Sequence, residues 1–252
     1  MRNEIIEKIM EKSPYKYANK SFVEKIFGLI RANTNEEKIK LVRAKLRKIS
    51  FSALPLKFYR KFKTLRFSTE IINMHRSTRE RSSVYLWLIG RLRGENARVI
   101  TDLGCGFNLI AFYYNGFIPE KYYGYEIDNA VVEFVRRFIS EKNLNAKIES
   151  RDASETEFED SDVCLCLKIF DALEDIERNI TLKLLERIMR KTKLIVASFS
   201  KISLSGRGRL REREWFEKML FSLGLKFTKE TKGNEVFYFI KGSVKSEFFP
   251  IC

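Results

Sequence analysis

The stretch ARVITDLGCGFN (97–108) decides the fold of this chain, because an apolar run ends in two glycines and leads into the helix-like segment LIAFYYNGF (109–117). Glycines at 104 and 106 allow a tight turn and a close approach of the backbone to a ligand. The pattern therefore predicts a strand, a ligand-binding turn and a helix. A plain turn between a strand and a helix is the alternative interpretation of the same residues.

The C-terminal part of the chain alternates between strand-like and helix-like segments. This alternation predicts a parallel sheet covered by helices on both faces. DVCLCLKIF is nearly all apolar, as a strand buried on both faces should be, so Cys164 and Cys166 are expected in the core. That apolar strand lies at 162–170, and further strands are predicted at 97–106, 121–128, 146–153 and 193–200. Helices are predicted at 130–143 and 215–224. Last come KFTKE (226–230) and EVFYFI (235–240), which predict an antiparallel hairpin and complete an α/β, Rossmann-like fold.

The first part of the chain is predicted to be helical. Apolar residues recur at helical spacing in 3–12, 22–30, 57–67 and 77–92. Thr34 and Glu37 form a capping box that opens another helix, which Leu54-Pro55 ends, and Ser77 and Glu80 form a second capping box. Phe58, Phe62 and Leu65 repeat at i, i+4 and i+7, which favours a place in the core over stacking on bases.

The positive charge of the chain is concentrated in its first two-fifths. The 252 residues hold 48 Lys and Arg against 33 Asp and Glu, a net charge of +15. Residues 1–95 hold 23 against 9, whereas residues 96–252 hold 25 against 24. Such asymmetry favours a polyanionic partner for the first part, with a solvated cationic face and a membrane surface as the alternatives. We predict a basic helical RNA-binding domain at 1–70, with Lys45 and Lys48 among its contacts, and a second domain at 71–252.

Composition excludes several classes of protein. No run of 18 apolar residues exists, and the start MRNEIIEKIMEK does not resemble a signal peptide, so we expect a cytoplasmic protein with no membrane partner. The four cysteines form no CxxC motif, and His75 is the single histidine, so no metal site is predicted. His75 is interpreted as a residue with a local structural role.

An acidic residue at the end of the second predicted strand indicates the kind of ligand. Glu126 lies 24 residues after Asp102, the spacing at which a carboxylate accepts hydrogen bonds from ribose hydroxyls. Leu109 stands where a dinucleotide fingerprint has its third glycine, which disfavours a pyrophosphate. A nucleoside cofactor without phosphates fits better.

Taken together, DLGCGFN (102–108), YYGYEID (122–128) and VVEFVRRFI (131–139) resemble the core of S-adenosyl-L-methionine-dependent class I methyltransferases. The chain is most similar to the aminoglycoside-resistance 16S rRNA guanine-N7 methyltransferases, the FmrO-like family. Three further stretches carry this resemblance: HRSTRER (75–81), SLSGRGRLREREWFEKML (203–220) and GNEVFYFI (233–240). The resemblance implies a class I methyltransferase sheet, parallel with an antiparallel C-terminal hairpin, plus an N-terminal helical domain.

The resemblance also implies roles for single residues. Arg79 would grip the cofactor carboxylate, Glu126 would hold the ribose, and Glu235 would lie near the target base or fix an arginine. The remaining expected cofactor contacts are Asp102, Gly104, Gly106, Asp152 and Ala153, with Lys168 and Glu235 as catalytic candidates and Arg207 and Arg209 as RNA contacts. Lys168 ends an apolar strand, where a lysine needs a partner to offset its desolvation.

The activity that follows is methylation of 16S rRNA, at N7 of a guanine in the decoding region, within the small ribosomal subunit and by a monomer. A methyltransferase of another RNA such as tRNA, and an inactive methyltransferase fold that binds RNA, are the alternatives. If the two domains divide the work, removal of residues 1–70 should lower RNA binding and leave cofactor binding nearly intact.

Overall fold

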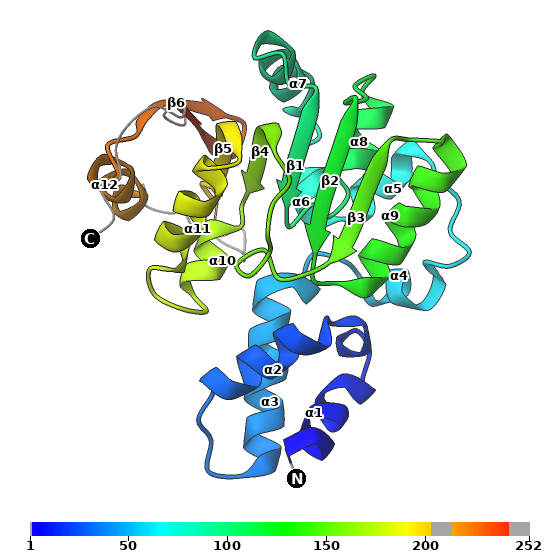
Figure 1. The fold of residues 1–252 in the computed structure, drawn as a ribbon. Coiled ribbons are helices and arrows are strands. Elements are labelled where there is room, and N and C mark those ends of the chain that lie inside the picture. Colours follow the sequence, from blue (N-terminus) through cyan, green and yellow to red (C-terminus); the bar gives the residue numbers. More distant parts are fainter. Residues whose placement is uncertain (1, 203–212, 242–252) are drawn as a thin grey trace.

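Seven strands form one sheet in the computed structural model, which describes residues 2–202 and 213–241 (Figure 1). Their order across the sheet is β3-β2-β1-β4-β5-β7-β6. The first five run parallel, and β7 pairs antiparallel with both β5 and β6. The strands are β1 Val99–Leu103, β2 Lys121–Glu126, β3 Ala146–Ser150, β4 Ser161–Leu167, β5 Thr192–Ser200, β6 Lys226–Lys232 and β7 Glu235–Lys241. The predicted Rossmann-like class I sheet with its C-terminal hairpin is confirmed.

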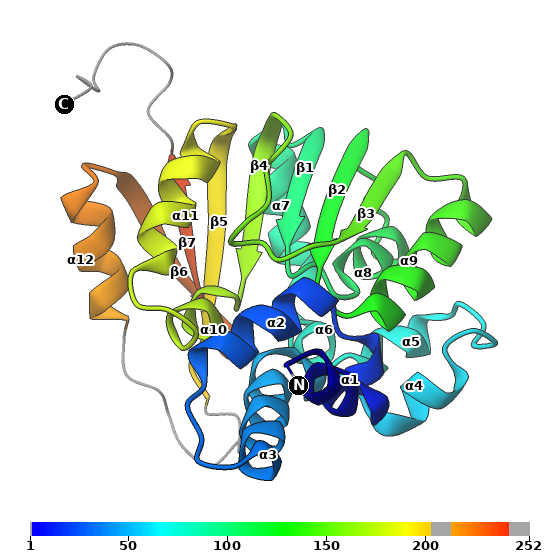
Figure 2. The same ribbon diagram turned by 60° about the horizontal axis from the view of Figure 1, so that its bottom comes forward.

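Helices cover both faces of the sheet because the chain winds outward from its centre in two directions. The path from β1 through β2 to β3 runs one way, and the path from β4 to β5 runs the other way. Right-handed crossovers then place α8 and α9 on one face and α11 on the opposite face (Figure 2). The helices in this part are α8 Asn108–Tyr114, α9 Asn129–Lys142, α10 Phe170–Glu174, α11 Ile180–Met189 and α12 Glu214–Ser222. Ligands of open α/β sheets bind where the strand order reverses, here between β1 and β4.

Strand β4 has the burial that its apolar sequence predicts. Val163, Cys164, Leu165 and Cys166 are each at most 1% exposed, since β4 lies between β1 and β5 and is covered on both faces. The strand is shorter than predicted. It ends at Leu167 because Lys168 adopts a left-handed backbone conformation, with φ of 62°, and α10 follows.

The helices within residues 2–46 lie beside the carboxyl ends of the parallel strands, as Figures 1 and 2 both show, whereas the helix that leads into β1 lies near the amino end of that strand. The elements are α1 Arg2–Glu11, the 3-10 turn η1 Tyr15–Tyr17, α2 Lys20–Leu29, α3 Asn35–Leu46, the π-helical turn η2 Arg47–Phe51, α4 Leu56–Lys61, α5 Thr69–Met74, α6 Arg76–Glu80 and α7 Tyr85–Gly94. Asn19 anchors this part to the sheet edge. Its backbone N–H donates to Ile127 O at 2.8 Å, and its side-chain Nδ2 donates to Ser150 O at 3.0 Å.

Helix α3 begins as the capping box predicts. Thr34 Oγ1 accepts a hydrogen bond from Glu37 N at 3.2 Å, and Glu37 Oε2 accepts from Asn33 N at 2.9 Å. Its continuation differs from a regular helix, because the last turn before Pro55 is the π-helical turn η2. Such turns are frequent at functional sites.

The aromatic residues of α4 belong to the core, as their spacing predicts. Phe58 and Phe62 are 0% and 2% exposed. The Phe58 ring packs edge-on against Phe107 and Phe134, with centroids 5.6 and 5.5 Å away. These contacts join α4 to the start of α8 and to α9, while the domain boundary at residue 70 stays a prediction.

The single helix predicted at 77–92 is wrong, because the chain forms two helices, α6 and α7, with a turn between them. The residue that caps α6 is His75, whose ring nitrogen accepts from Thr78 N, and not Ser77. The break has a tertiary cause: Arg81, at the end of α6, is buried and faces Glu235 of β7.

Within residues 2–202 and 213–241, none of the helices is long and apolar enough to cross a membrane. The same residues contain no cluster of His, Cys, Asp and Glu that could hold a metal ion.

Candidate active site at the carboxyl edge of the sheet

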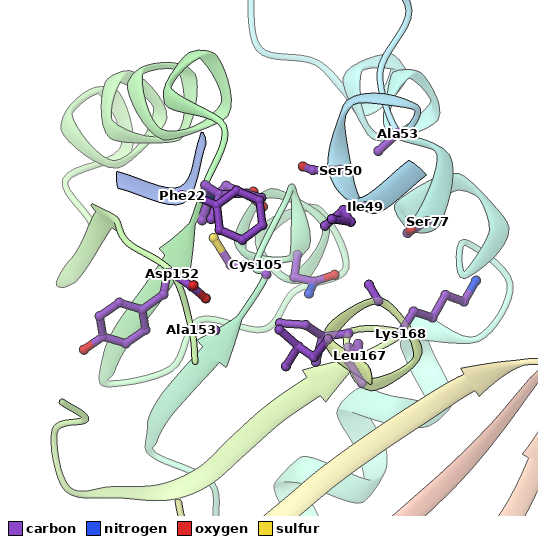
Figure 3. Close-up of a pocket in the computed structure, with 18 of the residues that line it drawn as sticks. Phe22, Ile49, Ser50, Ala53, Ser77, Cys105, Asp152, Ala153, Leu167 and Lys168 are labelled. Atoms are coloured by element: carbon purple, nitrogen blue, oxygen red, sulfur yellow. The ribbon is translucent and has the colours of Figure 1, made fainter. Parts of the chain in front are cut away.

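A pocket opens at the carboxyl ends of β1, β2 and β4, where the strand order reverses (Figure 3). Its floor includes Glu126, the last residue of β2, and Gly104 and Asp152 from the turns after β1 and β3. Segments of the N-terminal helices form the other wall, with Phe22 from α2 and Ile49 from η2. The pocket thus combines apolar walls with a few polar groups, as small-molecule sites do.

The turn after β1 has the tight geometry that its glycines predict. Gly104 N donates to Tyr125 O at 2.9 Å, and both Gly104 and Gly106 have positive φ, 66° and 46°. A Cβ on residue 106 would lie 2.7 Å from His75 Cε1. Position 106 therefore requires glycine both for its conformation and for its contact with His75.

The Glu126 carboxylate is held in place by backbone groups. Oε1 accepts from Ile127 N at 2.8 Å and Asp128 N at 3.2 Å, and Oε2 accepts from Gly106 N at 3.1 Å. Burial raises the pKa of Glu126, although the three N–H groups act in the opposite direction. A carboxylate has about four acceptor positions. One therefore remains for a hydroxyl group in the pocket.

Asp152 and Ala153, which follow β3, both line the pocket. Its Oδ1 accepts from Ser154 N at 2.9 Å and Ser154 Oγ at 2.8 Å. Its Oδ2 accepts from Lys25 Nζ at 2.8 Å. The sequence did not indicate Lys25, which comes from α2, 127 residues earlier in the chain.

Arg81 and Arg151 line the pocket, whereas Arg79 lies outside it. Arg79 is exposed, lines a neighbouring groove, and donates from Nη1 to Asn73 O at 3.4 Å. Arg81 is 1% exposed, and its Nε and Nη2 both donate to Glu235 Oε2 at 3.2 Å. Its Nη1 donates to Asn108 Oδ1 at 3.1 Å. Burial alone would lower the pKa of Arg81, but the negative charge of Glu235 raises it.

Lys168 and Glu235 meet beside this arginine. Lys168 Nζ lies 2.9 Å from Glu235 Oε1 and 2.9 Å from Glu80 Oε2, so the lysine has the partners that its position demands. Burial would raise the pKa of Glu235, but the charges of Arg81 and Lys168 hold it below its usual value. Glu235 thus fixes an arginine, one of the two arrangements expected for it.

Asp102 does not line the pocket but lies behind it. It is 0% exposed, and its Oδ2 accepts from Tyr122 OH at 2.6 Å and Asn108 Nδ2 at 2.9 Å. Burial raises its pKa to about 6. The contact that it makes orients Asn108, which does line the pocket.

His75 has the local role predicted for it. Its Nδ1 lies 2.8 Å from Thr78 Oγ1, and its ring packs on Phe107 with centroids 5.2 Å apart. Burial and the nearby charges of Arg81 and Lys168 lower its pKa to about 3, so the imidazole is neutral at pH 7.

Lys45 and Lys48, two of the predicted RNA contacts, do not line the pocket. The ammonium groups of Lys45 and Lys48 both contact Asp175, which follows α10. Arg207 and Arg209 fall outside the described residues.

The N-terminal helices and the pocket are not separate units. Phe22, Ile49, Ser50 and Ala53 all line the pocket, and Lys25 pairs with Asp152. These contacts count against the expectation that residues 1–70 can be removed with cofactor binding nearly intact, which stays a prediction. The cause is tertiary, since the helices pack on the edge at which the strands end.

Comparisons with known proteins agree with this geometry. A family model described as "Ribosomal RNA methyltransferase (FmrO)" matches residues 66–225. The solved structure of the 16S rRNA methyltransferase RmtF, in complex with S-adenosyl-L-homocysteine, has a TM-score of 0.83 and 19% identity and covers 96% of this chain and 98% of its own. An rRNA methylase from Escherichia coli has a TM-score of 0.80 and 20% identity over 96% and 100% of the two chains. The 16S rRNA methylase ArmA has a TM-score of 0.58 and 27% identity over 74% and 95%. No match is found among curated proteins.

Proposed function

The chain belongs to the ribosomal RNA methyltransferase (FmrO) family, and we propose that it transfers the methyl group of S-adenosyl-L-methionine to N7 of a guanine in the decoding region of 16S rRNA. The observation that carries this proposal is the pocket in which the Gly104 turn, Glu126 and Asp152 meet at the reversal of strand order. The likeness to RmtF, which was solved with S-adenosyl-L-homocysteine, and to the 16S rRNA methylase ArmA supports the choice of cofactor and substrate.

The pocket residues fit a nucleoside cofactor that carries an amino acid. Glu126 keeps an acceptor position for the ribose hydroxyls, and Asp152 with Ala153 suits the adenine base. For the cofactor carboxylate we assign Arg81 in place of Arg79, because Arg81 lines the pocket. Glu235, Asn108 and Tyr85 accept four of its five N–H groups, so one N–H of Nη2 is left for the cofactor. Gly104 and Gly106 let the backbone pass close to the methionine part.

The reaction at guanine N7 places few chemical demands on the protein. N7 carries a lone pair and no proton, so no general base is required, and the cofactor's sulfonium supplies an activated methyl group. The residues must align the base with the methyl group and exclude water, and such placement contributes about 7–11 kcal/mol in well-oriented reactions. Extruding the base from its stack costs a few kcal/mol, which contacts from the protein offset.

Lys168 is the candidate for contact with the target base. Its side chain is 13% exposed at the rim of the pocket, and Glu80 and Glu235 hold its ammonium group. A held ammonium can donate to guanine O6 while leaving N7 free to attack. Glu235 acts as a positioning residue, since it contacts both Lys168 and Arg81.

The basic N-terminal part supplies the grip on the RNA. We propose that residues 1–70 form the RNA-binding domain, that Lys45, Lys48, Arg207 and Arg209 contact phosphates, and that the protein acts as a cytoplasmic monomer on the small ribosomal subunit. Phosphate contacts release counterions and stabilise the complex at low salt. This contribution offsets the cost of extruding the base.

The proposal is tested by incubating the protein with methyl-labelled S-adenosyl-L-methionine and small ribosomal subunits, naked 16S rRNA or tRNA. We expect label in 16S rRNA, at one guanine of the decoding region when the product is mapped by mass. Glu126→Ala should lose this activity and weaken cofactor binding by about 1.5 kcal/mol or more, as expected for lost charge-assisted hydrogen bonds.

The matched control is Glu120→Ala, because Glu120 is exposed and precedes β2 at the opposite edge of the sheet. This variant should keep both properties. If only tRNA were labelled, the substrate would be tRNA and not 16S rRNA. Failure to bind the cofactor would point to an RNA-binding protein without methyltransferase activity.

A further inference from the structure

Helix α2 contributes a lysine to the end of the pocket where Asp152 lies. Lys25 Nζ is 2.8 Å from Asp152 Oδ2, 2.7 Å from Ser154 Oγ and 2.9 Å from Glu155 Oε1. The Lys25 and Asp152 side chains are 18% and 4% exposed, so water screens this pair less than a surface pair. Burial would lower the pKa of Lys25, but the two carboxylates raise it, so the amine stays charged.

The contacts of Asp152 leave it one direction in which to accept a hydrogen bond from a ligand. Both acceptor positions of Oδ1 face Ser154, and Lys25 occupies one of the two on Oδ2. In Figure 3 the carboxylate points into the pocket. The position that remains on Oδ2 therefore faces the space where a base would lie.

The helix that carries Lys25 is itself fixed above the pocket. Phe22, one turn earlier on α2, is 2% exposed and lines the pocket. Asn19 caps the helix by accepting from Phe22 N at 3.1 Å, and its Nδ2 donates to Ser150 O at 3.0 Å. Lys25 therefore reaches Asp152 from a helix that is tied to the end of β3.

We propose that Lys25 is a positioning residue for recognition of the cofactor's adenine. By donating to Asp152 Oδ2, it orients the carboxylate so that this oxygen can accept a hydrogen bond from the 6-amino group. This inference rests on the proposed function, to which it adds Lys25 as a residue that determines the preference for a ligand with a 6-amino group. Without Lys25, the Asp152 carboxylate can rotate away from the base, and its preference for a ligand with an amino group falls. Cofactor recognition thereby depends on a helix of the N-terminal part.

The test measures calorimetrically how the full-length protein binds two probes, S-adenosyl-L-homocysteine and its analogue with hydrogen in place of the 6-amino group. The wild type should prefer the first probe by about tenfold, the effect of a hydrogen bond to a charged group. Lys25→Met should weaken binding of the first probe about tenfold and leave the analogue within about twofold, so that the preference disappears. Lys25→Arg should keep the preference, since a guanidinium can hold the same carboxylate.

Lys20→Met is the matched control, because Lys20 is exposed on the same helix and its loss removes the same charge. It should leave both affinities unchanged. If Lys25→Met weakens both probes equally, or neither, the inference is overturned while the proposed function stands. If the wild type binds neither probe, the proposed function fails and the inference with it.

Discussion

Asp102 shows how a carboxylate can serve the site without entering it. Its Oδ1 has no hydrogen-bond partner among the described residues, and burial raises its pKa from 3.8 to about 6. A carboxyl whose pKa is raised in the folded state stabilises the fold most at low pH, and this contribution is lost as the pH rises through 6. The charged form is tolerated because Tyr122 and Asn108 donate to Oδ2.

Asp102→Asn should therefore remove part of the pH dependence of stability. From pH 5 to pH 8 the free energy of unfolding of the wild type should fall, relative to that of the variant, by about 1–2 kcal/mol. Urea denaturation of both proteins at each pH measures this difference. A constant difference across the range would show that Asp102 does not titrate in this window.

Two arginines of HRSTRER (75–81) show that burial of a single side chain cannot be predicted from neighbouring residues. Arg79 and Arg81 have the same chemistry and lie two positions apart, yet only Arg81 is buried and lines the pocket. The sequence predicted that Glu235 lies near the base or fixes an arginine, but it did not indicate that this arginine is Arg81. Burial of Arg81 depends on β7, which follows more than 150 residues later.

At the scale of elements, the turn between β1 and α8 is held by a contact that local pattern cannot show. Gly106 faces the His75 ring, so the N-terminal cap of α6 lies directly against the glycine turn. Gly116 provides a comparison, because its φ is also positive, 72°, and nothing lies within 4 Å of its hypothetical Cβ.

We expect Gly106→Ala to lower the free energy of unfolding more than Gly116→Ala does. Gly116→Ala should cost about 1 kcal/mol for its backbone strain alone, and Gly106→Ala about 1–3 kcal/mol beyond that for displacing His75. Thermal or urea unfolding measures both. In a His75→Ala background the extra cost should shrink, and equal costs of the two alanines would contradict the contact.

At the scale of the whole molecule, the cationic N-terminal part and the nearly neutral sheet share one pocket. Lys48 forms an ion pair with the Asp175 carboxylate, and Lys45 donates to the Asp175 backbone carbonyl. An exposed ion pair contributes only about 0–1 kcal/mol, so a phosphate can displace the carboxylate from Lys48. The surplus charge of the first 95 residues should then make RNA binding strongly dependent on salt.

The double variant Lys45→Ala/Lys48→Ala should bind small ribosomal subunits more weakly, with the log–log salt slope reduced by about 1.4–1.8 for two lost phosphate contacts. Filter binding at several salt concentrations measures this slope. Lys191→Ala/Lys193→Ala is the control, since these lysines pair with Asp160 and Asp162 at the amino edge of the sheet. Equal slopes for both double variants would remove Lys45 and Lys48 from the interface.

The sequence by itself determined the layered α/β fold, the glycine turn, the acid that ends β2 and the acid after β3, and the concentration of charge in the first part. These features are local, because strand and helix periodicity, turn chemistry and charge are written in neighbouring residues. Only the tertiary structure decided that Arg81 and not Arg79 faces the pocket, that Asp102 lies behind it, and that Lys25 reaches Asp152. The contacts of Arg81 and Lys25 join segments 154 and 127 residues apart, and those of Asp102 join β1 to β2 and α8. Each depends on which side chains become buried together when separate elements pack, and no short stretch of sequence contains that information.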